Sequence, residues 1–582
     1  MDESAERTRV EWREWGPEPF EIADRAGKPV LLSLSATWCS WCHEMDEETY
    51  SEPRIAANVN DGFVPVRVDV DRHPRVRERY NMGGFPSTVF LTPAGEQLTG
   101  AGYLGPDGMR QVITSVRKMW DGKGAEAGRV PRSLQGEATP AGELTSRIEE
   151  QLLGALHETY DEQAGGWGAD AKFPMPRTIE FALKREREQA VRTLDAVGAN
   201  LLDDYAGGFY RYAAGGDWSE PHYEKMLDTN AALVRAFANA YLYTGREEYR
   251  QPAADTIDYL TTTLWTGDAF AGSQSAGPGA EFYAREPTDR EAAEEPPVDP
   301  TPFADRNALA VDALLTYHAY TDGDAARRYA ERALDYLAET LIEDGEVVHF
   351  RDPENADEVG ESLLLADHAR TVAALTTARE VLGADALGGR AVSIAERVAD
   401  AAIDELHDEG SFRDGPASGE GLLDRPLRPL DGNVEMADAL LDLAVLTGEE
   451  RYRRVARETI EAFAGAWDRF GPQVAGYGSA ASRLLNGTLV IRIGDDAGSD
   501  LHRAALRMGD HEKVVVPDAE AVEAGTAAAS IVTDAADADE RSSSSPRSQA
   551  REDAAATAAP AETPEQLEAR VSDLIEERSA DS

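Results

Sequence analysis

One helical unit occurs three times in this chain, and this repetition constrains the fold more than any other feature. The unit consists of a helix, a Thr-Gly or Asp-Gly turn and a second amphipathic helix with aromatic anchors. Its copies are AYLYTGREEYRQPAADTIDYL from Ala240, YHAYTDGDAARRYAERALDYL from Tyr317 and LAVLTGEERYRRVARETIEAF from Leu443. A single hairpin cannot bury its own apolar face, so repeated hairpins are expected to stack into one continuous core.

Six segments rich in glycine and aromatic residues separate the predicted helix pairs, at intervals of about 40 to 75 residues that fit two helices and two loops. They are AGGWGADAKFP, AGGFYRYAAGGDW, DAFAGSQSA, GEVVHFRD, EGSFRDGP and VAGYGSAAS. Six such segments predict six hairpins, arranged as a closed (α/α)6 toroid or as an open solenoid. We favour the toroid, because its loops would gather at one mouth and so resemble one another. The aromatic side chains there would either stack on sugar rings or pack the loops, and both interpretations stay open.

Both cysteines of the chain, Cys39 and Cys42, stand three positions apart in SATWCSWCHEM. The preceding KPVLLSLSA predicts a buried strand, and the following CHEMDEETYSEPRIAANVN has helical spacing. Cys39 is therefore expected at a helix N-terminus, where unpaired backbone N–H groups lower the pKa of a thiol. We expect Cys39 to be the nucleophile and the less exposed Cys42 to resolve the mixed disulfide. The alternatives are a zinc site, for which His43 and His73 are the nearby imidazoles, and a CxxC without turnover.

A second alternating strand, FVPVRVDVD, follows this helix, and after it come the helical RHPRVRERYNM, the hairpin segment GGFPSTVFLTPAGEQLTG and the helical GPDGMRQVITSVRKMW. This order resembles the thioredoxin fold from end to end. The resemblance implies that Pro86 is a cis-proline beside the CxxC that helps to dock an extended peptide, with Trp38 and Arg67 supporting the redox site. Without the resemblance, Pro86 would be an ordinary turn proline.

The resemblance to thioredoxin is incomplete at the group that handles the proton of the second thiol. Thioredoxins have a buried aspartate six positions before the first cysteine, where this chain has Ser33. His43 or Glu44 could take its place. Arg67 stands where a lysine is expected, and it cannot lose its proton. The sequence therefore leaves the direction of the redox reaction open.

Five stretches together resemble a known family more specifically than any single motif. They are KPVLLSLSATWCSWCHEMDEETYSEP, VDVDRHP, GGWGADAKFP, GGFYRYAAGGDWSEPHYEKML and LLDRPLRPLDGNVEMADALL. They are similar to the spermatogenesis-associated thioredoxin-domain family, which joins a thioredoxin-like domain to a toroid resembling six-hairpin glycosidases and N-acylglucosamine epimerases. The resemblance runs from about Trp12 to Val516 and implies the architecture, although the family has no settled activity. Two departures are Ser40 in place of a histidine and a missing tryptophan before the asparagine of DPTPFADRNALAV.

A cluster of polar residues marks one predicted helix entry, in GGDWSEPHYEKMLDTNAAL. His222, Glu224 and Asp228 lie close together there, and the spacing of four predicts that the two carboxylates share one helix face. Paired carboxylates near a histidine could act as general acid and base on a sugar. They could equally form a salt-bridged cap at the helix start. The stretch RPLDGNVEMADALL predicts a second entry of this kind.

The chain carries 58 basic and 108 acidic residues, a net charge of −50, which excludes nucleic acids and anionic membranes as expected partners. Only seven of the basic residues are lysines. This composition predicts adaptation to concentrated salt, where the Debye length falls to about 3 Å and self-repulsion is screened. The segment MDESAERTRVEWREWG has no apolar signal region, and no window approaches 18 consecutive apolar residues, so we expect a cytoplasmic protein.

The C-terminal part of the chain changes character twice. TLVIRIG, LHRAALRM and EKVVVPD predict a strand, a helix and a strand, and DAADADERSSSSPRSQAREDAAATAAPAE predicts disorder by its composition. The final TPEQLEARVSDLIEERS predicts a capped helix with an apolar stripe, which could dock on the body or on a partner.

These observations predict a thioredoxin-like α/β domain over 1–122, a linker over 123–141, an (α/α)6 domain over 142–490, a closing segment over 491–530 and a disordered acidic tail with a terminal helix over 531–582. The predicted function is thiol–disulfide exchange, with a protein thiol or disulfide substrate and a thioredoxin-reductase-type reductant as expected partners. The alternatives are a carbohydrate-processing or carbohydrate-binding toroid regulated by the first domain, and a non-catalytic scaffold. No cofactor and no metal are expected.

Overall fold

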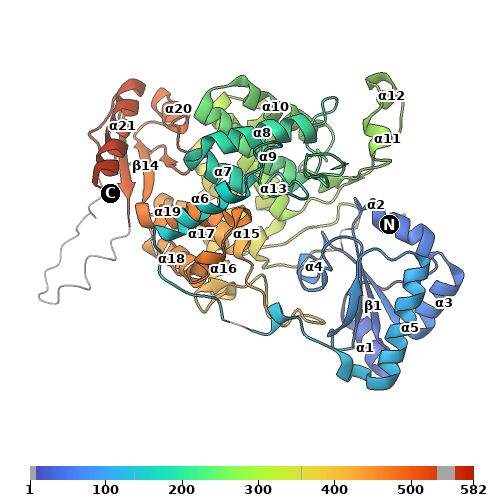
Figure 1. The fold of residues 1–582 in the computed structure, drawn as a ribbon. Coiled ribbons are helices and arrows are strands. Elements are labelled where there is room, and N and C mark those ends of the chain that lie inside the picture. Colours follow the sequence, from blue (N-terminus) through green and yellow to red (C-terminus); the bar gives the residue numbers. More distant parts are fainter. Residues whose placement is uncertain (1–7, 137, 356, 534–556, 582) are drawn as a thin grey trace, which may run out of the picture.

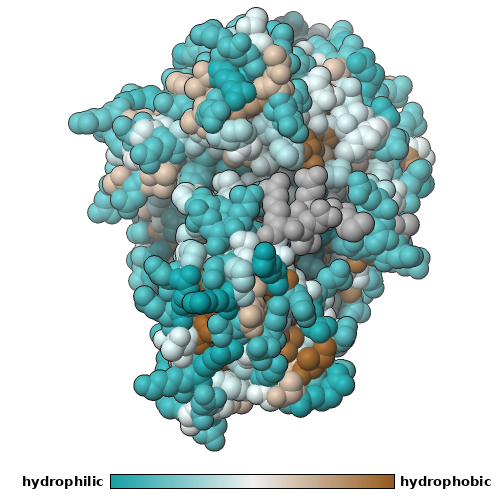
Figure 2. Space-filling model, turned by 90° about the vertical axis from the view of Figure 1, so that its right-hand side faces the viewer, coloured by the Kyte–Doolittle hydropathy of each residue, from teal (hydrophilic) through white to brown (hydrophobic). Residues whose placement is uncertain are grey.

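The computed structural model describes residues 8–136, 138–355, 357–533 and 557–581. An α/β domain comes first along the chain, and a larger helical domain packs against one side of it (Figure 1). The predicted pairing of a thioredoxin-like domain with a helical toroid is confirmed. Among the described residues, no helix combines the length and the apolar character needed to cross a membrane. The face drawn in Figure 2 is mainly hydrophilic, with small and separated apolar patches.

A mixed four-stranded sheet forms the centre of the N-terminal domain. Its elements are α1 (Pro17–Ala26), β1 (Val30–Ser35), α2 (Ser40–Met45), α3 (Pro53–Gly62), β2 (Val64–Asp69), α4 (Pro74–Tyr80), β3 (Ser87–Leu91), β4 (Gln97–Ala101) and α5 (Pro106–Lys123). The strand order is β2-β1-β3-β4, with β1 parallel to β2 and antiparallel to β3. β1 is apolar because its residues alternate between two buried clusters, with Leu32 and Leu34 on one face and Leu31 on the other. The predicted strands and helices of this domain are confirmed.

Six helical hairpins form the second domain. They are α6 (Arg147–Thr159) with α7 (Pro176–Arg185), α8 (Arg187–Leu201) with α9 (Leu227–Thr244), α10 (Glu247–Thr262) with α13 (Ala304–Thr321), α14 (Asp324–Tyr336) with α15 (Leu365–Leu382), α16 (Ala391–Leu406) with α17 (Leu430–Thr447) and α18 (Glu450–Ala464) with α19 (Gly476–Asn486). The second helix of each pair packs against the second helix of the next pair, and α19 also packs against α7. This contact closes the inner ring, so the domain is the predicted toroid and not an open solenoid.

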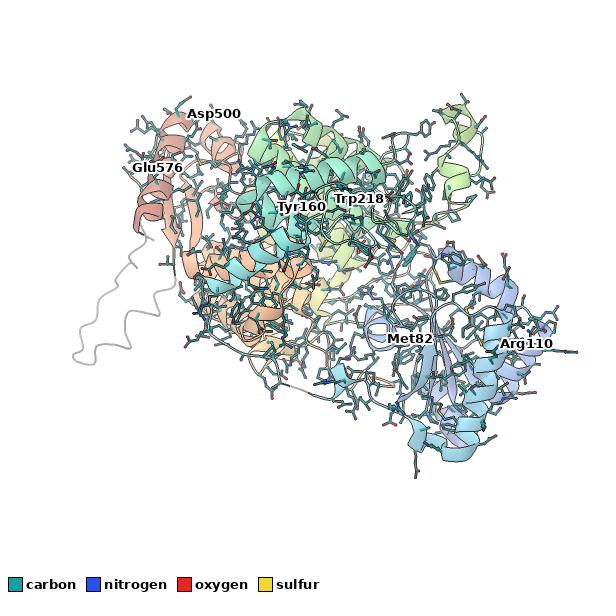
Figure 3. The ribbon with its side chains drawn as sticks, viewed as in Figure 1. Met82, Arg110, Tyr160, Trp218, Asp500 and Glu576 are labelled. Carbon is teal, nitrogen blue, oxygen red and sulfur yellow. A yellow bond between two sulfur atoms is a disulfide. The ribbon has the colours of Figure 1, made fainter. Side chains whose placement is uncertain are left out.

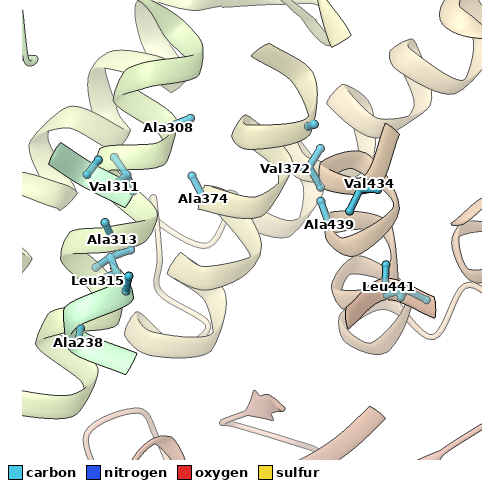
Figure 4. Close-up of a cluster of buried hydrophobic side chains, with 14 of the residues drawn as sticks. Ala238, Ala308, Val311, Ala313, Leu315, Val372, Ala374, Val434, Ala439 and Leu441 are labelled. Atoms are coloured by element: carbon cyan, nitrogen blue, oxygen red, sulfur yellow. The ribbon is translucent and has the colours of Figure 1, made fainter. Parts of the chain in front are cut away.

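Inner and outer helices differ in sequence because they differ in burial. The inner helices α13, α15 and α17 have buried residues on all sides, whereas the outer helices α14 and α18 bury one face and expose charged residues on the other. Figure 4 shows small side chains such as Ala308, Ala313, Ala374 and Ala439 on neighbouring inner helices. Such small residues let adjacent helices approach closely, because the distance between helix axes depends on the side chains at the contact.

An asparagine at the fourth position of three inner helices fixes the loop that precedes the helix. The asparagine oxygen accepts the backbone N–H of a phenylalanine, with N to O distances of 2.6 to 2.8 Å, and the amide group donates to the carbonyl of the same phenylalanine. The pairs are Asn230 with Phe209, Asn307 with Phe270 and Asn433 with Phe412. The three phenylalanines are buried. Of the two interpretations of the glycine-and-aromatic segments, loop packing is therefore the one that holds for these residues.

The C-terminal segment adds a small sheet beside the ring. Its elements are β14 (Thr488–Ile493), α20 (Asp500–Leu506), β15 (Val514–Val516) and β16 (Ala527–Val532). β14 pairs in parallel with β15 and antiparallel with β16. The predicted strand, helix and strand are confirmed, and β16 is an additional strand that was not predicted.

The terminal helix α21 (Pro564–Asp581) packs on α20 and β16. Leu567, Val571 and Leu574 of its predicted apolar stripe are buried, whereas Ile575 is exposed. The helix therefore docks on the body of the protein.

The stretch predicted to be disordered runs over residues 534–562, of which 534–556 lie outside the described residues. Thr557 and Ala561 form bridges to Ser530 and Ala527 of β16, and Ala561 is buried, so the prediction is wrong for this last part of the stretch.

Helix α4 connects the two domains through buried arginines. Arg75 and Arg79 are both buried and enter the loop 414–425 of the helical domain. The Arg75 guanidinium donates to the carbonyl of Leu423 at 2.7 Å, and the Arg79 Nε donates to the carbonyl of Leu422 at 2.9 Å. A buried guanidinium needs such partners, because an unpaired buried charge is costly. The two domains are thus held together by hydrogen bonds as well as by apolar packing.

Candidate active site

The two cysteines lie where β1 ends and α2 begins. Cys39 is the N-cap of α2, and its Sγ accepts the backbone N–H of Cys42 at an N to S distance of 3.2 Å. The two sulfur atoms form a disulfide, and the Cα atoms are 5.3 Å apart. The predicted position of the pair at a helix start is confirmed. An N–H donor aimed at Sγ stabilises negative charge, so this placement favours a thiolate at Cys39 once the disulfide is reduced.

Pro86 lies in the predicted cis form, since the peptide bond between Phe85 and Pro86 is cis. Phe85 packs edge-on against the ring of Trp38, with ring centroids 5.9 Å apart. Pro86 is buried, whereas Gly83 and Gly84 before it are exposed. The backbone that leads into the cis-proline is therefore open to solvent beside the redox helix.

The two cysteines are equally buried. Each is only 4% exposed, so the expectation that Cys42 would be the less exposed of the two is wrong. Both belong to an apolar cluster that includes Met226 of the helical domain. The second domain thus helps to cover the pair, which the sequence of the first domain cannot reveal. Trp41, between the cysteines, is 51% exposed and packs edge-on against Tyr103.

Contacts from the helical domain reach the residues just before the CxxC. The guanidinium of Arg211 lies over the ring of Trp38, 4.5 Å from its centroid. The Thr37 hydroxyl donates to a carboxylate oxygen of Asp299 at 3.2 Å. Figure 3 labels Met82, in the loop that carries the cis-proline, on the side of the first domain that faces the helical domain. The edge with the CxxC therefore faces the mouth of the toroid, where the inner helices begin.

Two carboxylates accompany this edge, the buried Asp71 and the partly buried Asp69. Trp38 Nε1 donates to one oxygen of Asp71 at 2.7 Å, and Arg306 on α13 donates to the other at 2.5 Å. Burial alone would raise the pKa of Asp71, but the Arg306 charge and these two hydrogen bonds outweigh burial and lower it. At Asp69, burial and the negative charges of Asp71 and Asp299 raise the pKa to about 7. One carboxyl group beside the redox helix therefore titrates near neutral pH.

Arg67 supports the redox helix from the strand below it. The strand register pairs Arg67 on β2 with Ser33 on β1. Its guanidinium forms an ion pair with Asp46, a buried residue that the sequence analysis did not single out. Glu44, one of the two substitutes considered for the missing aspartate, is exposed, and its carboxylate accepts a hydrogen bond from the Tyr103 hydroxyl at 3.1 Å. The signal that could have found Asp46 is its position four residues after Cys42, on the same side of a helix.

The second group of candidate residues does not form the expected arrangement. Glu224 precedes α9, which begins at Leu227, so Glu224 and Asp228 do not share a helix face and that prediction is wrong. His222 Nδ1 lies 3.4 Å from a Glu224 oxygen, and Arg211 lies 3.3 Å from the same oxygen. Burial alone would raise the pKa of Glu224, but the hydrogen bond from His222 and the nearby Arg211 charge lower it. Glu224 is therefore held as a carboxylate between two basic groups.

Three aromatic rings stack at this mouth. Phe173 lies 4.6 Å from Tyr212 with an interplanar angle of 13°, and Tyr212 lies 4.1 Å from His222 with an angle of 14°. Phe173 is exposed, unlike the buried phenylalanines of the loops. Arg211, which covers Trp38, also lies 5.7 Å from the Tyr212 ring. The stack therefore lies close to the CxxC edge.

A cavity of about 200 Å³ lies inside the ring and is lined by residues of all six inner helices. Most of its charged side chains are paired, as where Arg235 bridges Glu180 at 2.7 Å and Asp312 at 2.5 Å. At Glu380, burial and the charge of Asp442 raise the pKa to about 8. None of the candidates His222, Glu224 and Asp228 belongs to the wall of this cavity.

Asp305, His349 and Asp367 bring donor atoms within 4.8 Å of one another, the spacing of a metal site. His349 Nδ1 lies 3.0 Å from Asp367, and its Nε2 lies 2.8 Å from the carbonyl of Asp71. Burial alone would lower the pKa of His349, but Asp367 outweighs it and raises the pKa to about 9. Both ring nitrogens then carry protons, so this cluster fits an ion pair within the helical domain, with a hydrogen bond from His349 to the Asp71 carbonyl of the first domain, better than it fits a metal ion.

Comparison with known proteins identifies the first domain. Residues 3–135 match the family described as Thioredox_DsbH, protein of unknown function, DUF255. Spermatogenesis-associated protein 20 is similar, with 29% identity over 294 residues for the Homo sapiens protein and 30% over 294 residues for the Mus musculus protein. The aligned part covers 44% of this chain and 37% of each of these relatives. Protein disulfide isomerase-like 2-2 from Oryza sativa subsp. japonica is 27% identical over 205 residues, 33% of this chain and 54% of that protein.

Solved structures with similar parts include a sugar epimerase from a ruminal bacterium. It has 13% sequence identity and a TM-score of 0.44, and the match covers 54% of this chain and 85% of that one. A DsbH oxidoreductase has 22% identity and a TM-score of 0.18, and the match covers 19% of this chain and 85% of that one. The fold described above rests on the closed ring of helices and on the strand order of the sheet.

Proposed function

We propose that this chain is a member of the spermatogenesis-associated thioredoxin-domain family and that its N-terminal domain exchanges thiols and disulfides through Cys39 and Cys42. The Cys39 thiolate attacks one sulfur of a substrate disulfide and releases the other as a thiolate. Cys42 then attacks the Cys39 sulfur of this mixed disulfide, releases the second substrate thiolate and forms the Cys39–Cys42 disulfide. A dithiol reductant of the thioredoxin-reductase type returns the pair to two thiols.

The observation that carries this proposal is the hydrogen bond from the Cys42 N–H to the Cys39 sulfur at a helix start. This donor lowers the free energy of a thiolate at Cys39, and it acts beside the cis-proline Pro86. No other cysteine is present in the chain to compete for the bond. The working compartment that we propose is the cytoplasm, where thiols are kept reduced and a reactive pair has a use that a structural disulfide would lack.

The proposed protein substrate would approach from the exposed side of the site. Trp41, Gly83 and Gly84 are exposed there, whereas the helical domain covers the opposite side of the pair. An extended peptide laid along the cis-proline loop would place its disulfide within reach of Cys39.

Reduction of insulin by dithiothreitol tests the proposal. We expect the wild-type protein to accelerate precipitation of the insulin chains, and we expect Cys39→Ser to show only the uncatalysed rate. Trp120→Phe is a matched control, because Trp120 lies on α5 and donates a hydrogen bond to the carbonyl of Gly27 away from the cysteines. Equal rates for wild type and Cys39→Ser would refute the function.

A second candidate function is favoured by the cavity in the ring. Its wall combines paired charges with the hydroxyl groups of Thr316, Tyr320 and Ser479, a surface suited to a polyhydroxylated ligand such as a sugar. Thermal shift with a panel of sugars tests this candidate. A rise in the melting temperature that disappears in Ser479→Val would support it, and the absence of any shift at high sugar concentration would contradict it.

A further inference from the structure

A buried carboxylate lies one helical turn from the second cysteine. The Asp46 N–H donates to the carbonyl of Cys42, so the two residues follow one another on the same side of the helix. The Asp46 side chain is only 2% exposed, and Cys42 is buried as well. The Asp46 carboxylate is therefore a buried group one turn after a buried thiol.

The strand below holds this carboxylate in place. Arg67 on β2 forms an ion pair with Asp46, and the register sets Arg67 beside Ser33 on β1. Ser33 has no ionisable group, so β1 offers no acid or base beneath the helix at this point. The helix thus supplies the carboxylate, and the Arg67 charge compensates for its burial.

The chemistry of the resolving step calls for such a group. A buried thiol in an apolar cluster resists ionisation, because desolvation disfavours the thiolate. Cys42 must nevertheless lose its proton before it can attack the mixed disulfide at Cys39. The Cβ atoms of residues four apart on a helix lie about 5–6 Å from each other, a distance that one water molecule can bridge for proton transfer.

Two other carboxylates near the site are less well placed. Glu44 is exposed and is engaged by the Tyr103 hydroxyl. Asp69 lies on β2 and not on the redox helix, and its Oδ1 accepts the backbone N–H groups of Asp71 and Arg72 at 2.8 and 3.4 Å. Asp46 is the buried carboxylate that shares a helix face with Cys42.

We propose that Asp46 is the base that accepts the proton of Cys42, an inference that rests on the proposed thiol–disulfide exchange. Cys39 first attacks the substrate disulfide, forms a mixed disulfide and releases one substrate thiolate. The Cys42 proton then passes through a water molecule to the Asp46 carboxylate, and the Cys42 thiolate attacks the Cys39 sulfur. The second substrate thiolate leaves, the protein disulfide forms, and Asp46 returns its proton to solvent. The substrate disulfide is reduced by two electrons, and the two protein thiols are oxidised.

A stoichiometric reaction separates the two steps. The reduced protein is mixed with the disulfide of 2-nitro-5-thiobenzoate, which releases one coloured thiolate when Cys39 attacks and a second one when Cys42 resolves. We expect Asp46→Asn to slow the second release about 100-fold at pH 7, the usual size of a general-base effect, and to leave the first release unchanged. The slowed phase should accelerate about tenfold for each unit of pH, because hydroxide then removes the proton.

Control variants distinguish a proton acceptor from a structural residue. Glu44→Gln and Asp69→Asn should leave both phases within twofold of wild type. The double variant Ser33→Asp/Asp46→Asn places a carboxylate on the strand beside Arg67, and we expect it to regain at least part of the lost rate. The proposal would be overturned if Asp46→Asn released the second thiolate at a rate within twofold of wild type, or if Asp69→Asn were the variant in which this rate falls.

The test also holds if Asp46→Asn fails to fold because its ion pair with Arg67 is lost. Far-UV circular dichroism reports the fold, and the double variant and Asp46→Glu then carry the comparison. The proposal would be overturned by a double variant that folds but releases the second thiolate no faster than Cys42→Ser does. Failure of the proposed function would look different, since insulin would not be reduced while both thiolates were still released from the disulfide of 2-nitro-5-thiobenzoate.

Discussion

The ion pair between Asp71 and Arg306 joins the two domains, and its removal gives the sharpest prediction about stability. The side chains are 2% and 7% exposed, and Asp71 also accepts the Trp38 N–H. Arg306→Met would leave a buried carboxylate without its cation. Breaking a buried ion pair by removing one partner costs about 3–5 kcal/mol. We therefore expect the free energy of unfolding to fall by about that amount, and the pKa of Asp71 to rise.

Urea unfolding at fixed KCl concentration, followed by tryptophan fluorescence and circular dichroism, measures this change. Arg110→Met is the matched control, because it removes an exposed pair with Asp107 and should cost less than about 1 kcal/mol. The double variant Arg306→Met/Asp71→Asn removes the stranded charge and should recover part of the loss. The reasoning from burial is refuted if Arg306→Met costs no more than Arg110→Met, or if the double variant is the least stable of the three.

Three further predictions follow from other parts of the structure. The pKa of His349 is raised to about 9, so the stabilising effect of its charge is complete below about pH 6.5 and is lost as the pH rises through 9. In urea titrations, the free energy of unfolding of wild type should therefore fall more across this pH range than that of His349→Gln. Parallel curves of free energy against pH for the two proteins would contradict this prediction. Leu574→Ala should lower the free energy of unfolding by about 2–5 kcal/mol because Leu574 is buried, whereas Ile575→Ala, at an exposed position, should change it little. The melting temperature should rise between low and molar KCl, because salt screens a net charge of −50; a constant value in differential scanning calorimetry would count against salt adaptation.

Local patterns predicted the elements of both domains. The apolar run before the cysteines became β1, and the apolar run after Pro86 became β3. Repeated Thr-Gly turns, as at Gly245 and Gly448, mark the passage from an inner to an outer helix, since each glycine adopts the left-handed conformation after the inner helix. These features depend on residues that are close together in the sequence, so they can be predicted from the sequence alone.

Features that depend on distant contacts were not predicted. Arg75 and Arg79 resemble solvated charges on a short helix, but they are buried because loop 414–425 offers them carbonyl groups. β16 is a short alanine-rich run that becomes a strand by pairing with β14. Neither partner can be identified from the local pattern, because each lies far away along the chain.

The candidate site was predicted only in part. The redox pair could be placed from the order of strands and helices, and its cis-proline from the resemblance to thioredoxin. The carboxylate one turn after Cys42 could not be placed, because its burial depends on how the helix lies on β2. Glu44 and Asp46 are both acidic and two residues apart. Only the structure shows that Glu44 faces solvent and that Asp46 is buried against Arg67.

The most direct test of the central claim is a redox titration of the cysteine pair. The protein is equilibrated with mixtures of reduced and oxidised glutathione, trapped with a thiol alkylating reagent and analysed by mass spectrometry. We predict one two-electron transition between a dithiol and a Cys39–Cys42 disulfide, and no such transition in Cys42→Ser. The account would be contradicted if both cysteines remained reduced, and were therefore both alkylated, in every glutathione mixture.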